Sequence, residues 1–148
     1  MGTQVLTFAD ISRSVDGYLR VPQVERDEVR LLWYSDYWDG PQSGMLIFGG
    51  KQCWFEVVVE NEDSLDWNRR FAILTLSADQ LADENRWHDL FHRCVGTHTD
   101  YTEYDDQQDG PPEGIMRPRE LHSEFYDAYK QREPRDYSKC EVLGWFQR

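Results

Sequence analysis

The chain has 148 residues, enough for one domain (1–148), and its 28 acidic side chains outnumber the 16 Lys and Arg residues to give a formal net charge of −12. Aromatic residues make up 14% of the sequence, which excludes the disordered acidic class, because such chains are poor in aromatic residues. The acidic balance also argues against direct binding of nucleic acid or of anionic lipid, since Lys and Arg supply most of the affinity in both cases.

The sequence carries no pattern typical of a membrane or secreted protein. Its longest apolar runs, such as residues 57–59, are far shorter than the roughly 20 residues that span a membrane, and residues 1–6 lack the features of a secretory signal. Cys53, Cys94 and Cys140 are odd in number and far apart, which is typical of reduced thiols rather than of a disulfide framework. We therefore expect a cytoplasmic protein.

The first clear strand pattern covers residues 29–34. Its alternation predicts that Val29, Leu31 and Trp33 share one face. Residues 35–43 contain an Asp-Gly-Pro sequence and are predicted to form a loop.

A β-hairpin is the strongest local signal in the sequence. The apolar runs 44–48 and 51–59 flank Gly49 and Gly50, and two glycines in this position favour a two-residue turn with positive φ angles. Apolar residues occur on both faces of the two runs. We therefore expect this hairpin to be central in its sheet and covered on both sides.

A helix is predicted over residues 78–95. Ser77 is a good N-cap and begins a capping-box pattern. The apolar face of the predicted helix is interrupted by Asp83 and Glu84, so a break is expected near Asn85.

The remaining elements define the fold class. Residues 70–76 and 140–146 read as strands, and residues 118–132 as an amphipathic helix. Strands cluster early and helices late, which favours an α+β fold over an alternating parallel one. The prediction is an antiparallel sheet of four to five strands with a central hairpin, packed by two main helices.

The predicted loop contains the first candidate binding residues. Asp36, Tyr37, Trp38 and Asp39 form a short run in which two carboxylates flank two rings. Tyr and Trp are the residue types that anchor protein interfaces, and loops held by a rigid hairpin often bind partners. The alternative is that the two rings fold back and cap the core.

The second candidate surface is an acidic segment. Residues 77–116 hold 10 acidic and 2 basic side chains, among them Asp100, Glu103, Asp105 and Asp106. Such a segment can present carboxylates to a basic groove, or it can be a solvated loop.

Two histidines give a weak metal candidate. His88 and His92 are four residues apart on the predicted helix, a spacing that can hold zinc. The zinc-protease pattern is not met, because Asp89 stands where that pattern has Glu. The simpler interpretation is a pair of imidazoles at the edge of the core, and we expect neither a metal nor a cofactor.

These features favour a non-catalytic protein-binding module, such as an inhibitor or immunity-type protein. Negative charge would attract a basic protein partner, and the two rings would then slow its release. One alternative is a nucleic-acid mimic that uses residues 100–109. Another is a small hydrolase or metal-binding enzyme that uses Asp36 or Asp39 with His88 or His92.

Overall fold

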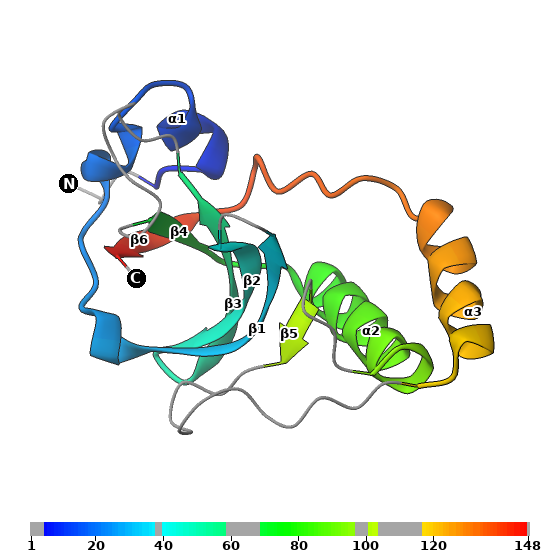
Figure 1. Ribbon diagram of the computed structural model, residues 1–148. Coiled ribbons are helices and arrows are strands. Elements are labelled where there is room, and N and C mark those ends of the chain that lie inside the picture. The colour runs from blue at the N-terminus through cyan, green and yellow to red at the C-terminus, as the bar shows by residue number, and fades with distance from the viewer. Residues whose placement is uncertain (1–4, 38–39, 59–68, 97–100, 104–116, 148) are drawn as a thin grey trace.

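The computed structural model (Figure 1) describes most of the chain, namely residues 5–37, 40–58, 69–96, 101–103 and 117–147. Within these ranges, only the backbone is described for residues 35–37, 40–41 and 101–103. None of the helices in the described part is long and apolar enough to cross a membrane.

A single antiparallel sheet forms the centre of the described structure, with the strand order β5-β1-β2-β3-β4-β6. The strands are β1 (Val29–Tyr37), β2 (Gly40–Phe48), β3 (Lys51–Val57), β4 (Arg70–Leu74), β5 (Tyr101–Glu103) and β6 (Val142–Gln147). Five of these strands have five residues or more, and β5 is a three-residue strand at one edge. The predicted α+β fold with an antiparallel sheet is therefore confirmed.

The hairpin of β2 and β3 lies in the middle of the sheet, as predicted. Gly49 and Gly50 have φ angles of 59° and 76°, which residues with a side chain rarely adopt. The turn pairs Phe48 with Lys51, the register expected from a two-residue connection. The glycine pair thus sets the register of the two central strands.

The prediction of a loop over residues 35–43 is wrong. These residues belong largely to the ends of β1 and β2, which pair as far as Tyr37 and Gly40. Gly40 and Pro41 of the Asp-Gly-Pro sequence are the first two residues of β2 rather than part of a loop. Pairing with a neighbouring strand overrides the local preference for a loop.

A β-bulge changes the face of one tryptophan. The pairing of β1 with β2 skips a residue between Leu31 and Trp33. Val29 and Leu31 therefore pack on one face of the sheet, whereas Trp33 packs on the other. The predicted common face for these three residues is wrong, because a bulge breaks the strict alternation of a strand.

Two main helices lie together on one side of the sheet, α2 (Ala78–Cys94) and α3 (Arg119–Lys130), as Figure 1 shows. The short helix α1 (Phe8–Ser12) lies apart from them, followed by the 3₁₀ turns η1 (Gly17–Arg20) and η2 (Arg26–Glu28). The two predicted helices are confirmed within a few residues at their ends.

Helix α2 has no break near Asn85, contrary to the prediction. It begins at the expected cap, where the Ser77 hydroxyl accepts a hydrogen bond from the backbone N–H of Gln80 at 3.1 Å. The helix continues through Asp83 and Glu84 because both carboxylates are paired with arginines from other parts of the structure.

Each face of the sheet carries its own core. The apolar face is built by Leu46, Cys53, Phe55, Phe71, Ile73 and Phe146. Three phenylalanine rings of this face pack together, with centroids 5.2–6.0 Å apart. The mixed face carries Trp33, Met45, Trp54, Ala72, Leu74 and Trp145, together with the carboxylate of Glu56. The prediction that the hairpin is covered on both sides is confirmed.

Candidate functional site

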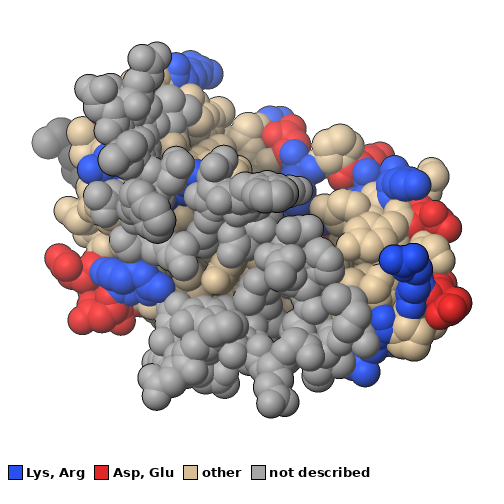
Figure 2. Space-filling view, viewed as in Figure 1, with Lys and Arg blue, Asp and Glu red and all other residues tan. Residues whose placement is uncertain are grey.

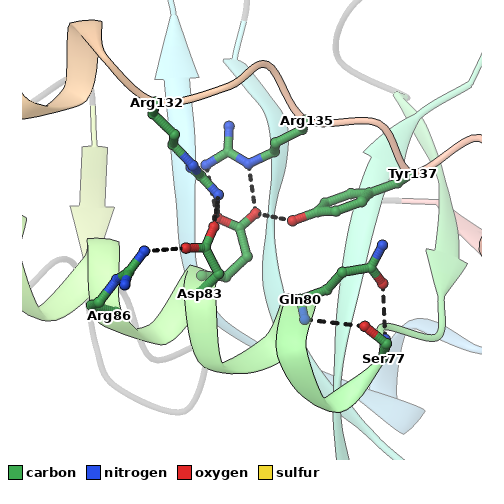
Figure 3. A network of polar contacts seen from close by, with 8 residues as sticks. Ser77, Gln80, Asp83, Arg86, Arg132, Arg135 and Tyr137 are labelled. Carbon is green, nitrogen blue, oxygen red and sulfur yellow. Dashed lines mark hydrogen bonds and ion pairs between the residues drawn. The ribbon is translucent and has the colours of Figure 1, made fainter.

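A dense cluster of polar side chains lies beside the mixed face. The strap, residues 131–140, connects α3 to β6 and carries Arg132, Arg135 and Tyr137 towards α2 (Figure 3). All three side chains donate to the carboxylate of Glu84, whose exposed fraction is only 2%. The sequence pattern did not identify this cluster as a site.

The geometry around Glu84 leaves it fully paired. Its Oε1 accepts from Arg132 Nη2 at 2.8 Å and from Arg135 Nη2 at 3.0 Å. Its Oε2 accepts from Arg135 Nε at 2.5 Å and from the Tyr137 hydroxyl at 2.6 Å. Four charge-assisted hydrogen bonds make this carboxylate a strong tether between α2 and the strap.

The network extends to the surface through Asp83. Its Oδ2 accepts from Arg132 Nη2 at 2.9 Å, and its Oδ1 accepts from Arg86 at 2.5 Å. The Arg132 guanidinium carbon also lies 5.5 Å from the ring centroid of Trp87 and 5.9 Å from that of Tyr129. Arg132 therefore joins the ion pairs to the aromatic contact between α2 and α3.

A second glutamate lies under the strap on the mixed face. Glu56 accepts a hydrogen bond from Trp54 Nε1 at 2.9 Å, and the Arg135 guanidinium carbon lies 4.9 Å from the ring centroid of Trp54. Arg135 thus contacts both the helix α2, through Glu84, and the sheet, through Trp54.

The pKa values of Glu84 and Glu56 are shifted in opposite directions. Burial opposes the ionisation of Glu84, but the hydrogen bonds and positive charge of Arg135, with Tyr137 and Arg132, outweigh it and hold its pKa below the usual value. Burial raises the pKa of Glu56, and the Trp54 hydrogen bond and the charge of Arg135 only partly oppose this. The folded structure therefore favours the ionised form of Glu84 and disfavours the ionised form of Glu56.

The Glu84 cluster has the character of a structural tether. The hydrogen bonds from Arg132, Arg135 and Tyr137 occupy both carboxylate oxygens of Glu84. Glu84 is therefore not placed to take a proton from a substrate. Burial raises the pKa of Tyr137, reinforced by its hydrogen bond to Glu84, which keeps the phenol protonated.

The sheet brings together the ends of the two predicted binding segments. Asp36 and Tyr37 are the last residues of β1, and Glu103 is the last residue of β5. The two strands are neighbours, with Ser35 opposite Tyr101. The other predicted binding residues, Trp38, Asp39, Asp100, Asp105 and Asp106, lie outside the described residues.

The two histidines of the metal hypothesis lie on α2. The His88 ring stacks on Trp33 with centroids 3.7 Å apart and an interplanar angle of 5°, and His88 is only 6% exposed. Among the described residues, no group of three or more His, Cys, Asp and Glu side chains is placed to hold a metal ion. The packing of His88 against Trp33 agrees with a histidine at the edge of the core.

Comparison with known proteins assigns no relative to this chain: no family model, no curated protein and no solved structure matches it. The function is therefore inferred from the geometry of the described residues and from the sequence.

Proposed function

We propose that this protein is a non-catalytic binding protein that engages a basic protein surface through one end of its sheet. This end is where β1 finishes and β2 and β5 begin. An inhibitor or an immunity-type protein would act in this way. The proposal includes a cytoplasmic location, supported by three cysteines that are all free and buried.

The pairing of β1 with β5 is the observation that carries the proposal. Without it, the aromatic residues at 37–38 and the acidic residues near 100 are two unrelated segments separated by about sixty positions in the sequence. With Ser35 opposite Tyr101, Asp36 and Tyr37 lie at the same sheet end at which β5 begins. This pairing supports a binding surface that combines carboxylates and aromatic residues at one end of the sheet.

The sequence adds further charge at this end. In the sequence, residues 36–39, 60–66 and 100 stand at the end of β1, after β3 and before β5, and together they contain seven of the 28 acidic side chains. Figure 2 shows a different arrangement on the side of the molecule where α2 and α3 lie, with Lys and Arg interspersed with Asp and Glu. The concentration of negative charge supports a basic partner.

The mechanism has two stages. Long-range attraction by the carboxylates raises the rate at which a basic partner is encountered. Tyr37 and Trp38 then fill a pocket of the partner, and burial of these rings slows release.

Affinity capture from the native host, followed by titration calorimetry with the purified partner, tests this proposal. We expect Tyr37→Ala/Trp38→Ala to weaken binding about 30-fold or more, as for aromatic interface anchors. The matched control is Tyr126→Ala on α3, which removes a ring that is 42% exposed, and we expect it to bind like the wild type. Equal binding by all three proteins would contradict the proposal.

The same assay distinguishes the nucleic-acid mimic. That function requires the carboxylates of residues 100–109, so Asp105→Asn/Asp106→Asn would abolish binding while Trp38→Ala would have little effect. Our proposal expects the opposite ranking. A partner that is a DNA- or RNA-binding protein, combined with the first ranking, would replace our proposal with the mimic.

A further inference from the structure

A hollow of about 640 Å³ lies between α2, the end of α3 and the strap. A volume of this size is typical of a small-molecule site. Its more buried lining includes Trp87, Arg132, Arg135 and Tyr137, while the deeply buried Glu84 is not one of the described residues that line it. The guanidinium groups therefore separate Glu84 from the hollow.

Charge is arranged in layers around this hollow. Its inner lining carries the two cations Arg132 and Arg135, and the half-buried Asp83 there is already paired with Arg132. The exposed lining residues include the carboxylates Asp79, Glu133 and Asp136 and one cation, Arg86, which pairs with Asp83. Arg132 and Arg135 are paired with Glu84, so the inner part of the hollow combines two cations with two carboxylates, while carboxylates predominate at the mouth.

Two buried donors near the hollow are unsatisfied. Arg132 Nη1 and Trp87 Nε1 are buried and have no hydrogen-bond partner among the described residues, and the Arg132 side chain is only 9% exposed. Leaving a buried donor unpaired destabilises a protein, and an acceptor bound beside it removes that cost. Both donors belong to residues that line the hollow.

We propose that this hollow binds a small zwitterion. A carboxylate or phosphate group of the ligand lies against Arg132 and Arg135, whose planar guanidinium groups match either oxyanion. An ammonium group of the same ligand faces Asp79 and Glu133 at the mouth. A ligand with only one of the two charges satisfies only one layer.

Titrations followed by ¹H–¹⁵N NMR of the full chain test this proposal. The two zwitterionic ligands are phosphoethanolamine and β-alanine, which distinguish phosphate from carboxylate. Inorganic phosphate and ethanolamine are the single-charge controls. For at least one zwitterion we expect saturable chemical-shift changes within residues 79–87 and 131–137. The affinity should be millimolar, because the ligand is so small. Both controls should bind at least about fivefold more weakly.

A pair of variants tests the role of the mouth. Asp79→Asn/Glu133→Gln removes two exposed carboxylates, and we expect it to weaken zwitterion binding about fivefold while leaving phosphate binding unchanged or stronger. Glu124→Gln/Asp127→Asn makes the same charge change on the exposed face of α3 and should have no effect.

Three results would overturn the proposal. The first is the absence of saturable shifts with both zwitterions up to about 10 mM. The second is binding of inorganic phosphate as tight as that of phosphoethanolamine, which would mean a simple anion site. The third is an equal loss of binding in the two double variants.

Discussion

The two faces of the sheet are built in different ways. The apolar face is closed by phenylalanine and aliphatic side chains, and Phe55, Phe71 and Phe146 are exposed by no more than 1%. The mixed face also has a buried core, but Glu56 lies on it and the Glu84 network closes over it. The apolar face is stabilised mainly by burial, whereas the mixed face combines burial with ion pairs between arginines and carboxylates.

The difference shows where stability and function are separable. Residues of the apolar core are held in place mainly by close packing. The polar cluster joins the strap, α2 and α3, and it leaves a charged hollow at its surface. Substitutions on the two faces should therefore differ in size, in sign and in dependence on pH.

Removing a ring from the apolar face should have the largest effect. We expect Phe55→Ala to lower the free energy of unfolding by about 4 kcal/mol, because the fully buried ring leaves a cavity. Urea unfolding followed by circular dichroism measures this. Tyr126→Ala on the surface should change stability by no more than about 0.5 kcal/mol, and similar values for the two variants would contradict the description of this face.

Breaking the Glu84 tether should have the next largest effect. We expect Glu84→Gln to cost about 3 kcal/mol, since Arg132 and Arg135 lose a buried counter-ion. The same unfolding assay applies, and hydrogen exchange should rise selectively in the strap. Glu124→Gln, an exposed change of the same kind on α3, should be nearly neutral. A loss no larger than that of Glu124→Gln would argue against the tether.

The tether should also depend on pH. Because the pKa of Glu84 is lower in the folded state than in the unfolded state, its contribution is complete above the ordinary glutamate pKa of about 4.3 and is lost as the pH falls towards the folded-state pKa. The wild type should therefore lose more stability than Glu84→Gln when both are acidified from about pH 6 to pH 3. Parallel curves from urea unfolding at each pH would be inconsistent with a lowered pKa.

Glu56 should give the smallest effect, with the opposite sign. Burial raises its pKa, so its ionised form at neutral pH opposes folding. We expect Glu56→Gln to stabilise the protein by less than about 1 kcal/mol at pH 7, with the Trp54 hydrogen bond retained by the amide oxygen. The difference between Glu56→Gln and Glu84→Gln, measured under identical conditions, sharpens the contrast. A loss of stability in Glu56→Gln as large as that in Glu84→Gln would contradict this contrast.

Local signals in the sequence were sufficient for part of the fold. Gly49 and Gly50 dictate a tight turn, and Ser77 dictates the start of α2, because each acts on residues close to it. The bulge before Trp33 was not predicted, since an extra residue in a strand has no sequence mark in regular alternation.

Long-range pairing explains what the sequence could not reveal about the sites. Glu84 meets Arg132, Arg135 and Tyr137 across 48 to 53 positions, so its interruption of an apolar helix face looked like a break. The approach of Asp36 to the start of β5 depends likewise on strand pairing. The sequence pattern singled out Asp36 as a candidate but not the Glu84 cluster, and it could not predict which distant residues come together in either place.

The rate of association with the captured partner, measured by stopped flow at increasing salt, tests the central proposal most directly. We expect the rate constant to fall steeply with ionic strength for the wild type. It should be lower, and less sensitive to salt, for Asp36→Asn/Asp39→Asn, whereas Glu124→Gln/Asp127→Asn should behave like the wild type. An association rate that is independent of salt, or equally reduced in both double variants, would contradict binding through the acidic end of the sheet.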